Sequence, residues 1–142
     1  MLRKIILSFL FFQSSVLLAG KQPIHPIAAG KVMLSKDLVQ KAKGIKTLFI
    51  VVYDEASKRP MPFGATKVML EKDANSEVHS FTLDTSNVRQ MGHGPLPKTM
   101  RLKARLDKDG SAGMDSAGDL MGDIKGVKLG AKDVVITIDQ AK

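Results

Sequence analysis

Apolar and charged residues alternate strictly along residues 99–107, TMRLKARLD. Successive side chains of a β-strand point to opposite faces, so this period of two predicts a strand with one face in the core and the other in water. The predicted inward row is Met100, Leu102, Ala104 and Leu106, and the predicted outward row is Arg101, Lys103 and Arg105.

Other segments carry the same period. Phe81 and Leu83 share a face in VHSFTL, and DVVITID places Val134, Ile136 and Ile138 together, while GKVMLS and TKVML supply shorter runs. The segment TLFIVVY, residues 47–53, is apolar on both faces, which is typical of a central strand whose second face is also covered. The chain is therefore predicted to be all-β.

A cover for the second face of residues 47–53 is available in SKDLVQKAK. Ser35 can cap a short helix near residues 36–43, on which Leu38, Val39 and Ala42 form an apolar stripe. We expect this helix to cover the second row of the strand; the alternative is that a partner protein covers it. That row consists of Phe49, Val51 and Tyr53.

Turn-forming segments separate the predicted strands. They are EASKRPMPFG, KDANS, MGHGPLP and a Gly/Ala/Ser/Asp-rich stretch over residues 107–122. Many short strands at regular spacing, without a long helix, predict an antiparallel β-sandwich. Residues 110–130 hold six glycines and little apolar mass, so we expect a long surface loop there. Asp109 and Gly110 are expected to form a turn, because DKDG lacks the ligand spacing of a calcium loop.

The first twenty residues read as an export signal. Arg3 and Lys4 precede an apolar run over residues 5–18, and the small residues Ala19 and Gly20 offer a cleavage point. The run is short for a membrane span, so no stable span is expected after cleavage, although an uncleaved anchor is the alternative. We predict a signal peptide over residues 1–20, a flexible lead over 21–29 and one domain over 30–142, located in the periplasm or otherwise exported.

Composition narrows the chemistry. The chain has no cysteine, so neither disulfides nor thiol chemistry are available. Without the predicted signal, 20 Lys and Arg stand against 14 Asp and Glu. These charges are interspersed and the mature aromatic residues are few, so no nucleic-acid binding is expected. A Ser/His/Asp set could be assembled from Ser80, His79 and Asp84, but adjacent residues of one strand point to opposite faces and no nucleophile elbow is present. We therefore expect neither an enzyme nor a cofactor.

Two proline-containing loops are the candidate partner-binding sites, RPMPFG and MGHGPLP. Stiff loops lose little entropy on binding, and methionine adapts to many apolar shapes. The candidate contacts are Met61, Phe63, Met91, His93 and Leu96. The alternative for the apolar members is that they only close one end of the sandwich.

A Cu(I) site is the alternative use of the second loop. Thioethers and imidazole suit Cu(I), and the glycines of QMGHGPLPKTM could bend the ligands together. The ligand set would be Met91, His93 and Met114.

Three segments resemble the C-terminal periplasmic domain of the CycH/CcmI cytochrome c biogenesis family. They are GKVMLSKDLVQKAKGIKTLFIVVYDEASKRPMPFGATKV, FTLDTSNVRQMGHGPLP and RLKARLDKDGSAGMDSAGDLMG, with residues 60–63, 81–84 and 118–122 the most specific parts. The resemblance implies an Ig-like β-sandwich. It also implies a non-enzymatic assembly module whose partners are apocytochrome c or haem-ligation proteins.

Overall fold

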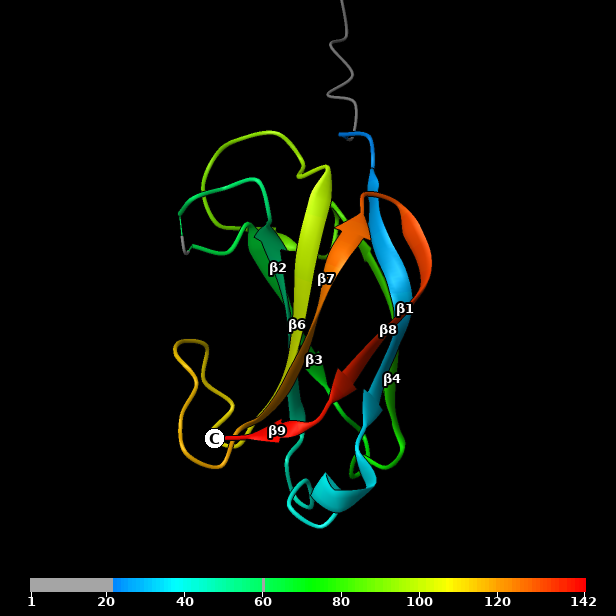
Figure 1. The fold of residues 1–142 in the computed structure, drawn as a ribbon, viewed down its shortest axis with the longest axis vertical. Coiled ribbons are helices and arrows are strands. Elements are labelled where there is room, and N and C mark those ends of the chain that lie inside the picture. Colours follow the sequence, from blue (N-terminus) through cyan, green and yellow to red (C-terminus); the bar gives the residue numbers. More distant parts are fainter. Residues whose placement is uncertain (1–21, 60) are drawn as a thin grey trace, which may run out of the picture.

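Two β-sheets pack face to face in the computed structural model, which describes residues 22–59 and 61–142 (Figure 1). The smaller sheet has the strand order β4-β1-β8 and the larger has the order β5-β3-β2-β6-β7-β9. The strands are β1 (Pro26–Leu34), β2 (Thr47–Asp54), β3 (Gly64–Met69), β4 (Glu77–Asp84), β5 (Arg89–Gln90), β6 (Thr99–Asp107), β7 (Leu120–Lys128), β8 (Ala131–Ile138) and β9 (Gln140–Ala141).

The core lies between the two sheets and follows the predicted alternation. Met100, Leu102, Ala104 and Leu106 of β6 are fully buried, as are Leu48, Ile50 and Val52 of β2. From the smaller sheet, Val32, Leu83 and Ile136 pack against them. Burial of each large apolar side chain contributes roughly 1.5–3 kcal/mol to the free energy of unfolding. The prediction of an all-β sandwich is confirmed.

The pairing of β1 departs from a purely antiparallel sandwich. It runs antiparallel to β4 but parallel to β8, with Gly30 opposite both Phe81 and Val134. A parallel pair needs a long connection, and here nearly the whole domain lies between the two strands.

The predicted start of the domain is wrong. β1 begins at Pro26, Ile27 is fully buried, and the Gly130 N–H donates to the Ile27 carbonyl over 2.7 Å. Residues 26–29 therefore belong to the sandwich instead of a flexible lead. The predicted signal peptide, residues 1–20, lies outside the described residues, and no helix of the described part is long and apolar enough to cross a membrane.

The expected helix near residues 36–43 is shorter than predicted. A 3₁₀ helix, η1, spans Lys36–Leu38, and turns continue to Gly44. The Ser35 hydroxyl bonds the Asp37 carboxylate and caps no backbone N–H, so the first turn lacks the stabilisation of an N-cap. Leu38 and Ala42 are buried in the core between the sheets. This segment therefore closes one end of the sandwich (Figure 1).

The expected loop over residues 110–130 is wrong in its second half, where β7 forms along the edge of β6. Close packing explains one of the glycines in β7. A Cβ on Gly122 would lie 1.8 Å from the Thr137 carbonyl oxygen of β8, so only glycine allows β7 to approach that strand. The glycine content alone suggested a flexible segment. In the structure, Gly122 lets the two sheets approach closely because it has no side chain.

Candidate functional site

The outer face of β2 is covered by cationic side chains of the neighbouring strands. Phe49, Val51 and Tyr53 lie directly opposite Arg105, Lys103 and Arg101 of β6. The Arg101 guanidinium lies 4.0 Å from the centre of the Tyr53 ring. Arg105 and Lys67 lie 5.0 Å and 5.9 Å from the centre of the Phe49 ring. The prediction that the segment near residues 36–43 covers this row is therefore wrong.

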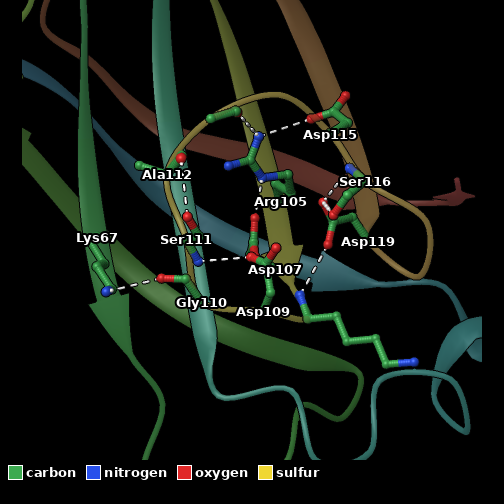
Figure 2. Close-up of polar contacts among 12 residues, drawn as sticks. Lys67, Arg105, Asp107, Asp109, Gly110, Ser111, Ala112, Asp115, Ser116 and Asp119 are labelled. Carbon is green, nitrogen blue, oxygen red and sulfur yellow. Dashed lines mark hydrogen bonds and ion pairs between the residues drawn. The ribbon is translucent and has the colours of Figure 1, made fainter.

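The loop over residues 108–119 folds back onto Arg105 (Figure 2). Arg105 Nη1 donates to the Gly113 carbonyl over 2.8 Å and to Asp115 Oδ1 over 3.0 Å. Lys103 Nζ donates to the second oxygen of Asp115 over 2.5 Å. Burial opposes ionisation of Asp115, but the hydrogen bonds from Lys103 and Arg105 hold its pKa below the usual range. This loop excludes water from Arg105, which the alternation alone had placed in solvent.

A second carboxyl group beneath the loop, that of Asp107, is almost completely buried. Its Oδ2 lies 3.0 Å from Arg105 Nε, while its Oδ1 meets no N–H or hydroxyl donor among the described residues. Figure 2 places the Asp109 carboxyl group beside it. Burial and the neighbouring Asp109 and Asp119 raise the pKa of Asp107, whereas the hydrogen bond with Asp107 lowers that of Asp109. These surroundings favour the protonated form of Asp107 and the ionised form of Asp109.

Asp119 fastens both ends of the same loop. It is fully buried and accepts from Lys108 N over 3.0 Å, from Ser116 N over 2.8 Å and from the Ser116 hydroxyl over 3.3 Å. The preceding Gly118 has a φ of +94°, which favours glycine. The segment GDLMG thus serves loop closure and strand packing.

At the other end of β2 and β6, the two proline-containing loops meet through the backbone. The Phe63 N–H donates to the Val52 carbonyl over 2.7 Å, and the Met91 N–H donates to the Phe63 carbonyl over 2.8 Å. Gly64 and Gln90 are paired between β3 and β5. Sequence positions almost thirty residues apart are therefore adjacent at the end of the sandwich.

The five predicted contact residues divide into two groups. Phe63 and Leu96 are half-buried and pack against the core, so they close the end of the sandwich. Met61 and Met91 are 64% and 46% exposed, and His93 is also exposed. The two methionines with the exposed part of Phe63 are hereafter the Met61–Met91 surface.

A side-chain hydrogen bond and two glycines shape the loop that carries Met91 and His93. Gln90 Nε2 donates to the Gly94 carbonyl over 3.2 Å and so bridges the ends of the loop. Gly92 and Gly94 have φ values of +111° and +149°, which side-chain-bearing residues rarely adopt. The geometry presents Met91 and His93 from a short, constrained loop.

Met114 comes from a different part of the molecule. It is 90% exposed on the loop that covers β6, whereas Met91 follows β5. The sheet order separates β5 from β6 by two strands, or about 14 Å at the usual strand spacing. Met91 and His93 lie two residues apart on one loop, and Met114 lies on a different loop. Copper binding remains a prediction.

A groove of about 740 Å³ adjoins the first of the two loops on the outer face. Tyr53 and Arg101 form one wall, and Arg59, Lys125 and Glu55 contribute further charges. Glu55 Oε1 accepts from Gly126 N over 2.7 Å, which ties the loop to β7. Sequence reasoning missed this groove because it depends on which strands become neighbours.

The comparisons with family models, curated proteins and solved structures gave no match.

Proposed function

We propose that the chain is an exported, non-enzymatic binding module that presents the Met61–Met91 surface to an apolar segment of a partner polypeptide. The resemblance to the CycH/CcmI domain suggests apocytochrome c or a haem-ligation protein as that partner. The observation that carries the proposal is the 2.8 Å hydrogen bond between Met91 N and the Phe63 carbonyl. This bond unites two loops into one surface.

Several properties of this surface suit an unfolded or partly folded client. Its two methionines are exposed, and their unbranched thioethers adapt to different apolar side chains. Hydrogen bonds to Val52 and across residues 90–94 restrain the loops before a partner arrives, which reduces the entropy lost on binding. Phe63 and Leu96 anchor the surface to the core.

The test uses a fluorescently labelled haem-free c-type apocytochrome and measures its dissociation constant by anisotropy. We expect Met61→Ala combined with Met91→Ala to weaken binding about tenfold, because exposed apolar contacts are lost. Met114→Ala is the matched control, since it removes a more exposed methionine from another loop. The folded holocytochrome should bind weakly because its apolar segments are buried.

Two outcomes would contradict the proposal. One is an apocytochrome affinity that the double substitution leaves unchanged. The other is an equal loss in Met114→Ala, which would indicate nonspecific contact through any exposed thioether. Anaerobic Cu(I) titration separates the alternative function, because a copper carrier would bind one equivalent and lose it in Met91→Ala and in His93→Ala.

A further inference from the structure

A second pocket lies at the opposite end of the sandwich from the Met61–Met91 surface. Its residues come from the turn that precedes β2, from the residue that follows β6, from the start of β7 with the loop before it, and from the C-terminal end of the chain. The pocket has a volume of about 590 Å³. No Asp or Glu lines the pocket. Four lysines do, namely Lys41, Lys43, Lys108 and Lys142.

These lysines have no acidic partner among the described residues within ion-pair distance. The acids nearest in the fold are already engaged. Asp73 accepts from Lys46 Nζ over 2.8 Å and from Gly44 N over 3.2 Å, and the Asp37 carboxylate is bonded by Ser35. Asp119 is buried beneath the loop. Lys41 and Lys43 help to lower the pKa of Asp37 and of Asp73, so their charges are partly compensated at longer range. An anion in the pocket would add a close partner for the four ammonium groups.

Backbone contacts hold two of the lysines in place. Lys108 N donates to Asp119 Oδ1, and a Cβ on Gly118 would lie 2.8 Å from Lys108 Cδ, so the lysine stem lies directly against this glycine. Lys142 N donates to the Asp119 carbonyl over 3.0 Å, and Gly118 N donates to the Lys142 carbonyl over 3.0 Å. The Gly118–Asp119 pair therefore positions both residues at the same pocket.

We infer that this lysine pocket binds a multivalent phosphate-type oxyanion. Ammonium groups suit such ligands as strong point charges, and several of them around one cavity favour a dianion over a monocarboxylate. A soluble phosphate compound and a lipid headgroup with a terminal phosphomonoester share this chemistry. The site is independent of the Met61–Met91 surface, because the length of β2 lies between them.

The first measurement is a calorimetric titration of the purified chain with inorganic pyrophosphate at low ionic strength. We expect saturable binding of one equivalent, weakened by added NaCl. Lys43→Gln combined with Lys108→Gln should reduce the affinity about tenfold, as expected for two exposed charge contacts. Lys31→Gln combined with Lys132→Gln is the control, since it removes the same charge from exposed positions on the smaller sheet.

The second measurement is sedimentation with phosphatidylcholine vesicles, with and without phosphatidic acid, whose terminal phosphomonoester can carry two negative charges. Binding to the anionic vesicles that only the Lys43/Lys108 variant loses would assign the ligand as a lipid headgroup. Pyrophosphate binding without vesicle binding would assign a soluble phosphate compound. The inference is overturned if neither probe binds, or if both double variants lose the same affinity. Met61→Ala with Met91→Ala should leave pyrophosphate binding intact, which separates the two sites.

Discussion

Tyr53 and Arg101 are opposite one another on β2 and β6, and the guanidinium lies 4.0 Å from the centre of the phenol ring. Arg101 also donates to Asp123 over 3.0 Å, so it is held between the ring and a carboxylate. The stacking replaces a hydrophobic cover for the outer end of β2. It also makes Tyr53 and Arg101 one wall of the groove beside the first proline-containing loop.

A double-mutant cycle should detect this stacking. We expect Tyr53→Leu and Arg101→Gln to be coupled by about 0.5–1 kcal/mol in the free energy of unfolding, measured by urea denaturation. Tyr53→Leu combined with Lys132→Gln should be additive, because Lys132 lies on the other sheet. Additivity in both pairs would mean that the stacking contributes nothing to stability.

The buried carboxyl group of Asp107 predicts an unusual pH dependence of stability. Its raised pKa means that the folded state binds the Asp107 proton more tightly than the unfolded state does. Its contribution to the free energy of unfolding is therefore largest below the unfolded pKa of about 3.9 and is lost as the pH rises through the raised folded pKa. Asp107→Asn keeps a neutral group that can accept from Arg105 and donate to Asp109.

Asp107→Asn should remove the loss of stability that accompanies a rise in pH. We expect the stability of Asp107→Asn relative to the native chain to increase between about pH 4 and pH 7, as measured by urea unfolding at a series of pH values. A constant difference across that range would contradict a raised pKa of Asp107 in the folded protein.

The contribution of Asp115 to stability should depend on pH with the opposite sign. Its pKa is lowered by the hydrogen bonds from Lys103 and Arg105, so its stabilisation is present above the unfolded pKa and is lost as the pH falls through the folded pKa. At pH 7 we expect Asp115→Asn to reduce the free energy of unfolding by about 1.5–3 kcal/mol. The difference from the native chain should shrink in acid. Asp139→Asn, an exposed control, should change stability by less than about 0.5 kcal/mol.

Two glycines of β7 should differ in their tolerance of alanine. Gly122→Ala places a Cβ 1.8 Å from the Thr137 carbonyl oxygen, so β7 and β8 must separate. We expect a loss of about 3 kcal/mol or more in the free energy of unfolding. A Cβ on Gly126 meets nothing within 4 Å, and its φ of +69° alone should cost about 1–2 kcal/mol. Equal losses in the two variants would contradict the close approach of the strands.

The candidate binding surface was predictable in its residues but not in its geometry. Proline, glycine and methionine marked both loops, since these residues have local conformational and chemical properties that hold in any fold. The division between the half-buried Phe63 and Leu96 and the exposed Met61 and Met91 depends on how each loop leaves its strand. The lysine pocket was not foreseen, because its members are dispersed along the chain.

The sequence by itself determined the all-β class and the inward rows of β2 and β6, because side-chain alternation is a local property of an extended backbone. Only the tertiary structure decided what lies on the outward rows. Arg105 became buried because a loop that follows its strand returns to it, and Phe49 was covered by cations from β3 and β6. Such contacts depend on strand order and register, which no short segment specifies.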